Sequence, residues 1–386
     1  MKQIRHRTGA VTEMERTTAK KNKYEIDMCN GTIMDKLISF SLPLMLSGIL
    51  QLMFNAVDII VVGRFSGSQA LAAVGSTSAL INVFTNLFIG ISLGANVLTA
   101  RFYAAGREKE VSETVHTAIT LALVSGIVMA LVGLVFSKGA LALMGTPDDV
   151  IGLSALYMRI YFLGMPFFML YNYGAAILRA VGDTKRPLLF LMIAGVINAC
   201  LNMVLVIVFK LGVAGVAIAT VISQMISCVL VLRCLCRSES SYRLRFSELG
   251  MKGYYLKQIF SVGIPAGIQS TVINFSNVLL QSSVNSFGST AMAGYTAANN
   301  LLGFLYVSVN SITQACMSFT SQNYGVGKLK RMDRVLADCM ILSVVVAVVL
   351  GCICYGFGPE ILQIYTEDAE VIACGMEILA YTTITY

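Results

Sequence analysis

The chain is built from apolar blocks that are long enough to cross a lipid bilayer. A helix needs about 20 residues to cross the hydrocarbon core, and nine such blocks are present, with a tenth beginning near residue 370. The nine blocks cover roughly residues 37–62, 78–100, 116–137, 152–178, 187–209, 211–234, 258–286, 291–320 and 335–357. With 56% hydrophobic and only 13% charged residues, the chain has too little polar surface for a soluble particle of 386 residues. We therefore predict an all-α integral membrane protein.

The second half of the chain repeats the first with an offset near 221 residues. The first-half residues Ala70, Ala72, Leu80, Tyr103 and Gly106 recur as Ala291, Ala293, Leu301, Tyr324 and Gly327. The proline of the first predicted span, Pro43, likewise pairs with Pro265. This offset spans six predicted helices, so both copies enter the membrane in the same direction, related by an axis along the membrane normal. Two related halves in a bilayer are typical of a transporter.

Loop charges predict the orientation, because Lys and Arg are held on the cytoplasmic side. The leading segment and every second loop after it hold all but four of the 28 Lys and Arg residues. The four exceptions are Arg64, Lys138, Arg159 and Lys210. We therefore expect a multi-pass protein of the plasma membrane with a cytoplasmic N-terminus, and the net charge of +7 reflects orientation rather than nucleic-acid binding.

The same pattern predicts four regions. Residues 1–36 form a cytoplasmic N-terminal segment, of which the polar lead from Met1 to Cys29 is expected to be disordered. Residues 37–235 form a six-helix bundle, and residues 236–257 form a cytoplasmic linker. Residues 258–386 form a second bundle, and by the repeat roughly 70 more residues would complete it, so the chain is either C-terminally truncated or a protein of ten helices.

One acidic residue stands out as a candidate functional group. Asp58 is the carboxylate that we place well inside a predicted span, where ionisable groups are costly and usually functional. Ser47, Gln51 and Asn55 precede it at helical spacing, which predicts a single polar stripe down the first helix. The alternative is that Asp58 simply reaches the membrane interface.

Two further spans carry polar residues at informative spacing. Asn198 and Asn202 are four residues apart and share a helix face, as ion ligands or interhelical hydrogen-bonding partners would. On the next span the small residues from Gly212 to Ala219 permit close helix contact, and Thr220 offers a hydroxyl group beside them.

These residues carry a family resemblance. The chain resembles the multidrug and toxic compound extrusion (MATE) family, and most of all its bacterial MepA-type branch, over about residues 30–386. The matching motifs are Leu42-Pro43-Leu44, Gln51 to Asp58, Val62-Gly63, Leu71 to Gly75, Ile177 to Thr184, Asn198-x-x-x-Asn202 and Gly215 to Thr220.

The resemblance implies a two-lobe bundle of six plus six transmembrane helices, of which about ten are present here. It also implies a secondary active antiporter that exports drugs or organic cations in exchange for H⁺ or Na⁺. The family's cation site corresponds here to Asp58, Asn198, Asn202 and Thr220. Many relatives carry Asp where this chain has Asn202, which leaves the site less charge to offset Na⁺.

A central substrate cavity is also implied. Polar and flexible side chains suit such a pocket, and our candidates are Gln51, Met53, Asn55, Gln281, Asn299 and Gln314. The expected partners are cationic amphiphiles and membrane lipids, and no nucleic acid is expected. We predict a monomeric protein with no cofactor beyond the coupling ion, H⁺ or Na⁺.

Two other classes of function stay open. A lipid-linked oligosaccharide or polysaccharide flippase of the same superfamily would need more basic residues in its cavity than Arg159 alone. A non-transporting scaffold or a non-functional fragment would not need a buried Asp58. An enzyme is not expected, because the sequence shows no clustered His, Asp, Glu or Cys at metal or nucleophile spacing.

Overall fold

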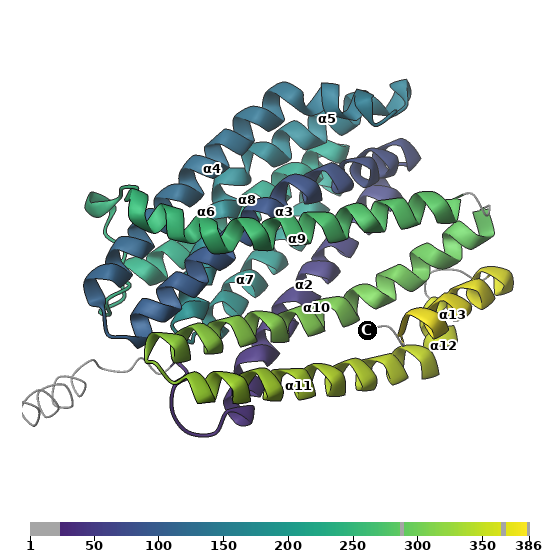
Figure 1. The fold of residues 1–386 in the computed structure, drawn as a ribbon. Helices are drawn as coiled ribbons and strands as arrows, with labels where there is room; N and C mark the ends of the chain where they lie inside the picture. The colour runs from purple at the N-terminus through teal and green to yellow at the C-terminus, as the bar shows by residue number, and fades with distance from the viewer. Residues whose placement is uncertain (1–23, 286–288, 364–367, 384–386) are drawn as a thin grey trace, which may run out of the picture.

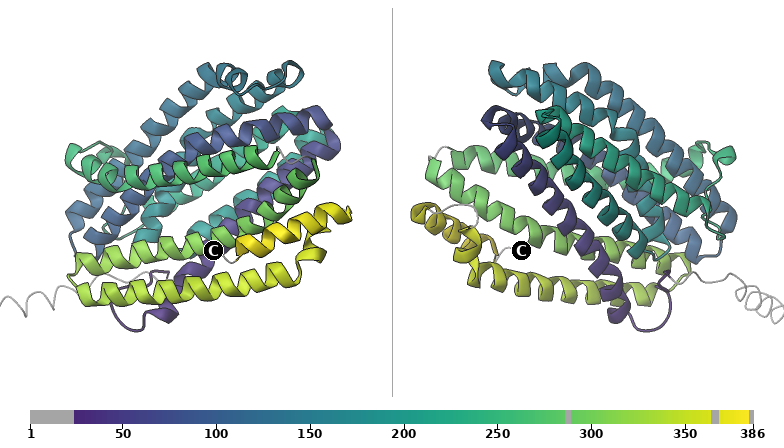
Figure 2. Two further views of the ribbon diagram at one scale, coloured as in Figure 1. Left: turned by 45° about the vertical axis from the view of Figure 1, so that its right-hand side comes forward. Right: turned by 180° about the vertical axis from the view of Figure 1, so that it is seen from behind.

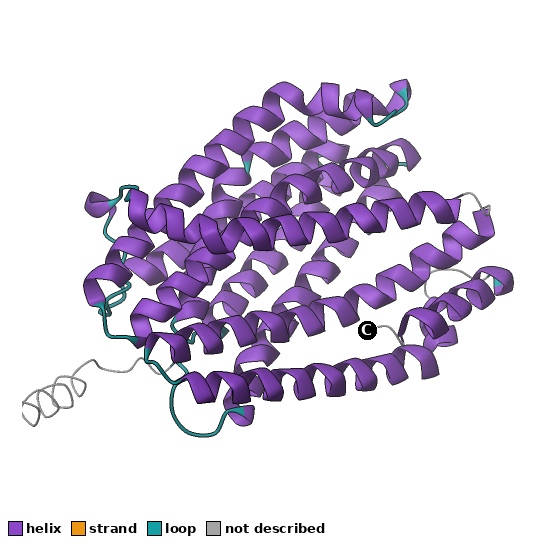
Figure 3. Cartoon of the chain, viewed as in Figure 1, coloured by secondary structure: helices purple, strands orange, loops and turns teal. Residues whose placement is uncertain are grey.

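The structure is a bundle of long helices. The computed structural model of the protein describes residues 24–285, 289–363 and 368–383, and no β-strand occurs among them (Figures 1 and 3). The helices of the first half are α2 (Met34–Phe65), α3 (Ser68–Ala104), α4 (Glu108–Leu143), α5 (Asp148–Leu163), α6 (Met165–Ala180), α7 (Lys185–Asn202) and α8 (Gly212–Cys236). Those that follow are α9 (Gly253–Asn285), α10 (Ser289–Gly325), α11 (Leu329–Gly356), α12 (Gly358–Leu362) and α13 (Ala369–Thr383).

The predicted apolar blocks fall on helical parts of the chain, which confirms the all-α fold class. Among the described residues, six helices are long and apolar enough to cross a membrane, or seven if the bent pair of α5 and α6 is one span. Helices α9 and α10 are of comparable length, but Asn, Gln and Ser residues interrupt their apolar sequence. Length and composition alone therefore support fewer spans than the ten that we predicted.

One predicted span is broken. The block at 152–178 was expected to be a single helix, but α5 and α6 meet at Gly164 with a bend of 47°. Pro166 stands in the first turn of α6. Because proline has no backbone N–H and its ring crowds the preceding turn, it starts a helix more readily than it continues one. The sequence Gly164-Met-Pro166 therefore explains the break.

The internal repeat is visible in helix geometry. Helices α3 and α10 have the same length, 37 residues, and each is followed two residues later by a glycine with positive φ, 68° at Gly106 and 73° at Gly327. At each end the glycine N–H donates to a tyrosine carbonyl three residues earlier, at 3.1 Å to Tyr103 and 3.0 Å to Tyr324. Glycine adopts this left-handed conformation without steric cost and terminates the helix. The repeat in sequence is thus a repeat of local structure.

The proline-bearing helices α2 and α9 cross between the halves. The first part of α2 packs in a cluster with α10 and α11 that includes Phe40, Phe319 and Val335. Conversely, Tyr255 and Ile259, at the start of α9, belong to the large core of the first half. Figure 2 shows the bundle turned by 45° and from behind. The residue ranges of the four regions remain a prediction, because each of these two helices packs across the predicted boundary.

One end of the bundle gathers most of the charged loops, and we call it the basic end. It comprises residues 24–33 and the connections after α3, α6, α8 and α10. In Figure 1 it lies on the left, where α9 begins and α10 ends.

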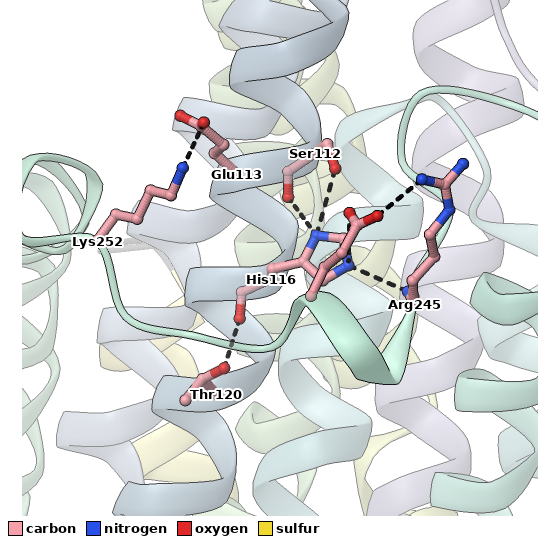
Figure 4. A network of polar contacts seen from close by, with 7 residues as sticks. Ser112, Glu113, His116, Thr120, Arg245 and Lys252 are labelled. Carbon is pink, nitrogen blue, oxygen red and sulfur yellow. Dashed lines mark hydrogen bonds and ion pairs between the residues drawn. The ribbon is translucent and has the colours of Figure 1, made fainter.

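The connection between α8 and α9 is held against α4 by a polar network at the basic end (Figure 4). His116 is buried, and its Nδ1 lies 2.6 Å from the carbonyl oxygen of Ser112 while its Nε2 accepts a hydrogen bond of 3.0 Å from the backbone N–H of Arg245. Lys252 pairs with Glu113, and the Arg245 guanidinium holds the pKa of Glu248 below its usual range. Part of the linker predicted at 236–257 is therefore ordered, with residues 246–248 in a short 3-10 helix.

Candidate functional site

Four polar side chains meet inside the first half of the bundle. Asp58 comes from α2, Asn198 and Asn202 come from α7, and Thr220 comes from α8. Asp58 is only 8% exposed and Asn202 is fully buried. These are the residues that the sequence singled out as a cation site, and the structure places all four in one hydrogen-bonded cluster.

The hydrogen bonds centre on the carboxylate. The amide nitrogen of Asn202 donates to Asp58 Oδ1 and also lies 3.2 Å from Asn198 Oδ1. Thr220 Oγ1 lies 3.4 Å from Asp58 Oδ2, and Asn198 Nδ2 lies 3.5 Å from Thr220 Oγ1. The two Asn side chains share a face because they are one helical turn apart.

Close packing of α2 on α7 makes this meeting possible. A Cβ atom at Gly195 would lie 1.8 Å from the ring of Phe54, a separation that no real pair of carbon atoms tolerates. Gly195 stands one turn before Asn198, and Phe54 stands one turn before Asp58. The missing side chain therefore lets the two helices approach at the level of the cluster.

The backbone of the α7 span changes form directly after the cluster. Asn202 is the last residue of α7, and residues Met203–Val208 continue as a π-helix. The N–H of Phe209 bonds to the carbonyl of Val204, five residues earlier, at 3.0 Å. Such wide turns are rare and occur frequently at functional sites. Here the wide turn begins immediately after a residue that bonds to Asp58.

The cluster leaves oxygen atoms available to a cation. Thr220 has one hydroxyl hydrogen, and the carbonyl of Val216 lies nearer, at 3.0 Å, than Asp58 Oδ2 does. A hydroxyl group donates a single hydrogen, so Oδ2 is the less satisfied oxygen of the carboxylate. Asn202 Oδ1 is buried without a hydrogen-bond partner. A proton on Oδ2, or a small cation held by oxygen ligands, would satisfy these atoms.

Sequence reasoning missed a second layer around the cluster. Tyr157 and Tyr161, one turn apart on α5, both interact electrostatically with Asp58, and their rings stack at 6.1 Å. Gln224, one turn beyond Thr220 on α8, is a further polar neighbour of Tyr161. The signal was present, because polar groups four residues apart within apolar spans indicate a shared polar face.

Comparison with known proteins places the chain in a family. A family model described as MatE matches the chain twice, at residues 43–204 and 265–386. The chain belongs to the MATE family. Both matches begin at a paired proline, Pro43 and Pro265, in agreement with the repeat.

Curated relatives cover most of the chain. It is 33% identical over 356 residues to a probable multidrug resistance protein, YoeA of Bacillus subtilis, with 90% of this chain and 76% of that protein covered. It is 23% identical over 350 residues to the multidrug export protein MepA of Staphylococcus aureus, with 90% and 76% covered. The MepA-type resemblance is thereby confirmed, and the protein is a multi-pass membrane protein of a multidrug efflux transporter family.

Solved structures show the same MATE fold. An outward-facing multidrug resistance MATE transporter of the MOP superfamily aligns with a TM-score of 0.88 at 20% identity, covering 95% of this chain and 82% of that one. A MATE protein in a straight conformation aligns with a TM-score of 0.87 at 20% identity, covering 95% and 82%. The same comparison gives 0.84 for a bent conformation, at 20% identity with 93% and 80% covered.

The predicted substrate-cavity residues do not join the hydrogen-bonded cluster around Asp58. Gln51, Met53 and Asn55 are exposed on α2, and Asn299 is exposed on α10. Gln314 is half-buried on α10, and the side chain of Gln281 lies outside the described part of the structure. The stripe expected on α2 therefore divides, because Gln51 and Asn55 are exposed while Asp58 turns into the bundle. A role in substrate contact remains a prediction for all six.

A further carboxylate, Glu377, lies in the middle of α13 and is exposed. At 15 residues, α13 is not among the described helices that are long and apolar enough to cross a membrane. No group of three or more His, Cys, Asp or Glu side chains suited to a metal ion occurs among the described residues.

Proposed function

We propose that this MATE protein exports organic cations in exchange for H⁺ or Na⁺, and that Asp58 is the residue that binds the incoming ion. The observation that carries the proposal is the buried Asp58 carboxylate, whose Oδ2 is weakly satisfied beside a free Asn202 oxygen. The relatives named above are transporters, so the protein would move a solute rather than catalyse a reaction on it. Their names also support multidrug substrates, of which cationic amphiphiles are the class we propose.

The orientation follows from charge. We place the protein in the plasma membrane with the N-terminus and the basic end in the cytoplasm, because Lys and Arg favour that side. In this orientation Asp58 lies in the part of α2 toward the outer surface. An ion entering from outside would reach Asp58 before reaching the basic end.

Neutralisation of Asp58 would link ion entry to drug release. An ionised carboxylate out of water is costly unless it is paired and hydrogen bonded. A proton or Na⁺ on Oδ2 removes the net charge of the cluster, and it can only shift a conformational equilibrium if one state binds it better. The hydrogen bonds of Asp58 to Asn202 and Thr220, and its poorly satisfied Oδ2 atom, depend on the spacing of α2, α7 and α8. A change in that spacing would therefore change the affinity for the ion.

Transport in proteoliposomes tests the proposal. We expect ethidium transport when either a pH gradient or a Na⁺ gradient is imposed, and the effective gradient identifies the ion. Asp58→Asn should abolish the response to both gradients. Asp35→Asn is the matched control, because Asp35 is an exposed carboxylate in the first turn of the same helix. Transport by Asp58→Asn equal to that of the control would reject the proposal.

A further inference from the structure

A segment before the first membrane helix spans both halves of the protein. We propose that residues 24–33, which we call the N-terminal strap, form a latch that holds the two halves together at the basic end. Our sequence prediction that the lead through Cys29 is disordered was wrong for residues 24–29, because Met28 is fully buried and Cys29 is nearly so. The latch rests on the proposed transport function, since only a protein that alternates between two states needs one.

The strap is tied to the first half mainly through one carboxylate. Glu25 accepts a hydrogen bond of 2.7 Å from the Tyr103 hydroxyl, at the end of α3, and one of 2.8 Å from the Tyr242 hydroxyl, in the connection between α8 and α9. Burial raises the pKa of Tyr242, so its hydroxyl keeps the proton that it donates. The N–H of Ile26 also donates to the carbonyl of Gly182 at 3.2 Å.

The strap fits closely against that glycine. Gly182 has a φ of 97°, and a Cβ atom there would lie 2.6 Å from the carbonyl oxygen of Ile26. Only glycine combines that backbone conformation with such a close approach of another chain segment. Gly182, in the motif Ile177 to Thr184 at the end of α6, is thus the residue against which the strap packs.

The strap is tied to the second half through its backbone carbonyls. Asn323 Nδ2 donates to the carbonyl of Met28 at 3.1 Å, Lys328 Nζ donates to that of Cys29 at 2.9 Å, and Arg331 donates to that of Asn30 at 3.2 Å. Hydrogen bonds from charged donors are stronger than neutral ones.

The side chain of Met28 adds an apolar contact to these polar ones. It packs in the buried cluster that joins α2 to α10 and α11. Both kinds of contact must be broken if α10 and α11 move away from the strap.

Neighbouring contacts show that the same end is closed. A Cβ atom at Gly325, the last residue of α10, would lie 2.2 Å from the carbonyl oxygen of Arg101 near the end of α3, so these helices touch through their backbones. Ser318 of α10 donates to Asn96 of α3 at 3.1 Å, and Gln322 of α10 donates to the carbonyl of Ala180 at 2.7 Å. The strap therefore lies at the point where α3 and α10 meet, and separating them at the basic end would require breaking its bonds to one half.

The two sides of the latch can be released separately. Glu25→Ala removes the acceptor for both tyrosine hydroxyls and leaves the second half untouched. The double substitution Lys328→Ala and Arg331→Ala removes the charged donors and leaves Glu25 untouched. Lys330→Ala is the matched control, because Lys330 is exposed in the same turn of α11 and makes no contact with the strap among those described.

Hydrogen–deuterium exchange of the full chain in lipid nanodiscs tests the latch without measuring transport. We expect uptake in residues 318–327 of α10 to rise at least about twofold in Glu25→Ala and in the double variant, because each substitution removes contacts of the closed state that the open state does not make. Uptake in the buried part of α4 should stay unchanged, which shows that the fold is intact.

Uptake in both variants equal to that in Lys330→Ala would overturn the latch. Failure of the transport proposal would look different, because ethidium transport would then be insensitive to Asp58→Asn whatever the exchange pattern. Glu25→Gln provides a further check, since its amide oxygen can still accept one hydrogen bond, and we expect an uptake between those of the wild type and Glu25→Ala.

Discussion

Helices α2 and α9 are repeats of one another, yet only α2 carries a carboxylate on a buried face. Both contain a proline, and aligning Pro43 with Pro265 pairs Asn55 with Asn277 and Asp58 with Leu280. Asp58 is buried among α7 and α8, whereas Leu280 is 54% exposed.

This comparison of α2 with α9 shows which features the two halves of the chain share. Helix crossing, proline position and the glycine caps after α3 and α10 occur in both halves. At the Asp58 position, the carboxylate belongs to the first half alone. The two halves therefore share a scaffold, whereas the ion binding that we propose for Asp58 is a feature of the first half.

The sharpest way to break this comparison is to exchange the two residues. Asp58→Leu should lose all gradient-driven ethidium transport, and adding Leu280→Asp should not restore it, because Leu280 has no partner comparable to Asn202 or Thr220 in the described contacts. Transport in proteoliposomes is the measurement. Recovery of more than about a tenth of wild-type activity, a difference of less than about 1.4 kcal/mol in the barrier, would show that the position on α9 is equivalent.

The next largest effect concerns the approach of α2 to α7. Gly195→Ala places a methyl group into the ring of Phe54 and should destabilise the protein by about 1–3 kcal/mol, as overpacked cores do. Thermal unfolding in detergent measures the loss, and adding Phe54→Ala should recover part of it. Gly152→Ala is the control, because no atom lies within 4 Å of a Cβ at that position. Equal stability of the two single variants would contradict the close contact.

How much of this site the sequence could predict depends on the residue. The spacing of Asn198 and Asn202 placed them on one helix face, and the family resemblance joined them to Asp58 and Thr220. The approach of Phe54 to Gly195 could not be read from spacing, because it depends on the crossing of two helices. The π-helix after Asn202 was equally hidden, since residues Met203–Val208 are apolar and suit an ordinary helix.

The fold, like the site, was predictable from the sequence only in part. The lengths of the apolar blocks predicted where the helices lie. The break at Gly164-Met-Pro166 could have been predicted from its glycine and proline, but the continuous apolar run favoured a single helix. Polar composition suggested disorder for the lead, but the buried Met28 and the paired Glu25 are ordered by residues that are 295 and 217 positions away in the chain. Contacts at such separation arise from the packing of the whole molecule, which a local pattern does not contain.

Asn202→Asp would sharpen the comparison by adding a second acid to the site. Two carboxylates within hydrogen-bond distance repel one another unless a cation neutralises them. We therefore expect stronger Na⁺ dependence, with the Na⁺ concentration for half-maximal transport lowered by about tenfold, because oxygen ligands with more negative charge bind cations more tightly. Asn172→Asp provides a control on α6, and an unchanged Na⁺ dependence of Asn202→Asp would count against a cation at this cluster.

The smallest expected effect concerns the paired residues Asn55 and Asn277, which are exposed on both helices. If each contributes one hydrogen bond to a substrate, Asn55→Ala and Asn277→Ala should each raise the KM for ethidium by about threefold to tenfold, the worth of a net hydrogen bond of about 1 kcal/mol. The maximal rate should be unchanged, since ion coupling is not altered. A change in only one variant would show that the substrate contacts are as asymmetric as the ion site.

The most direct test of ion coupling at Asp58 is ethidium binding to the purified protein as a function of pH and Na⁺ concentration. Linkage requires that an ion competing for one site weakens drug binding by up to about tenfold for each tenfold rise in ion concentration. We predict this dependence on H⁺ or Na⁺ for the wild type, and a dissociation constant independent of both for Asp58→Asn. A dependence that persists unchanged in Asp58→Asn would contradict the account.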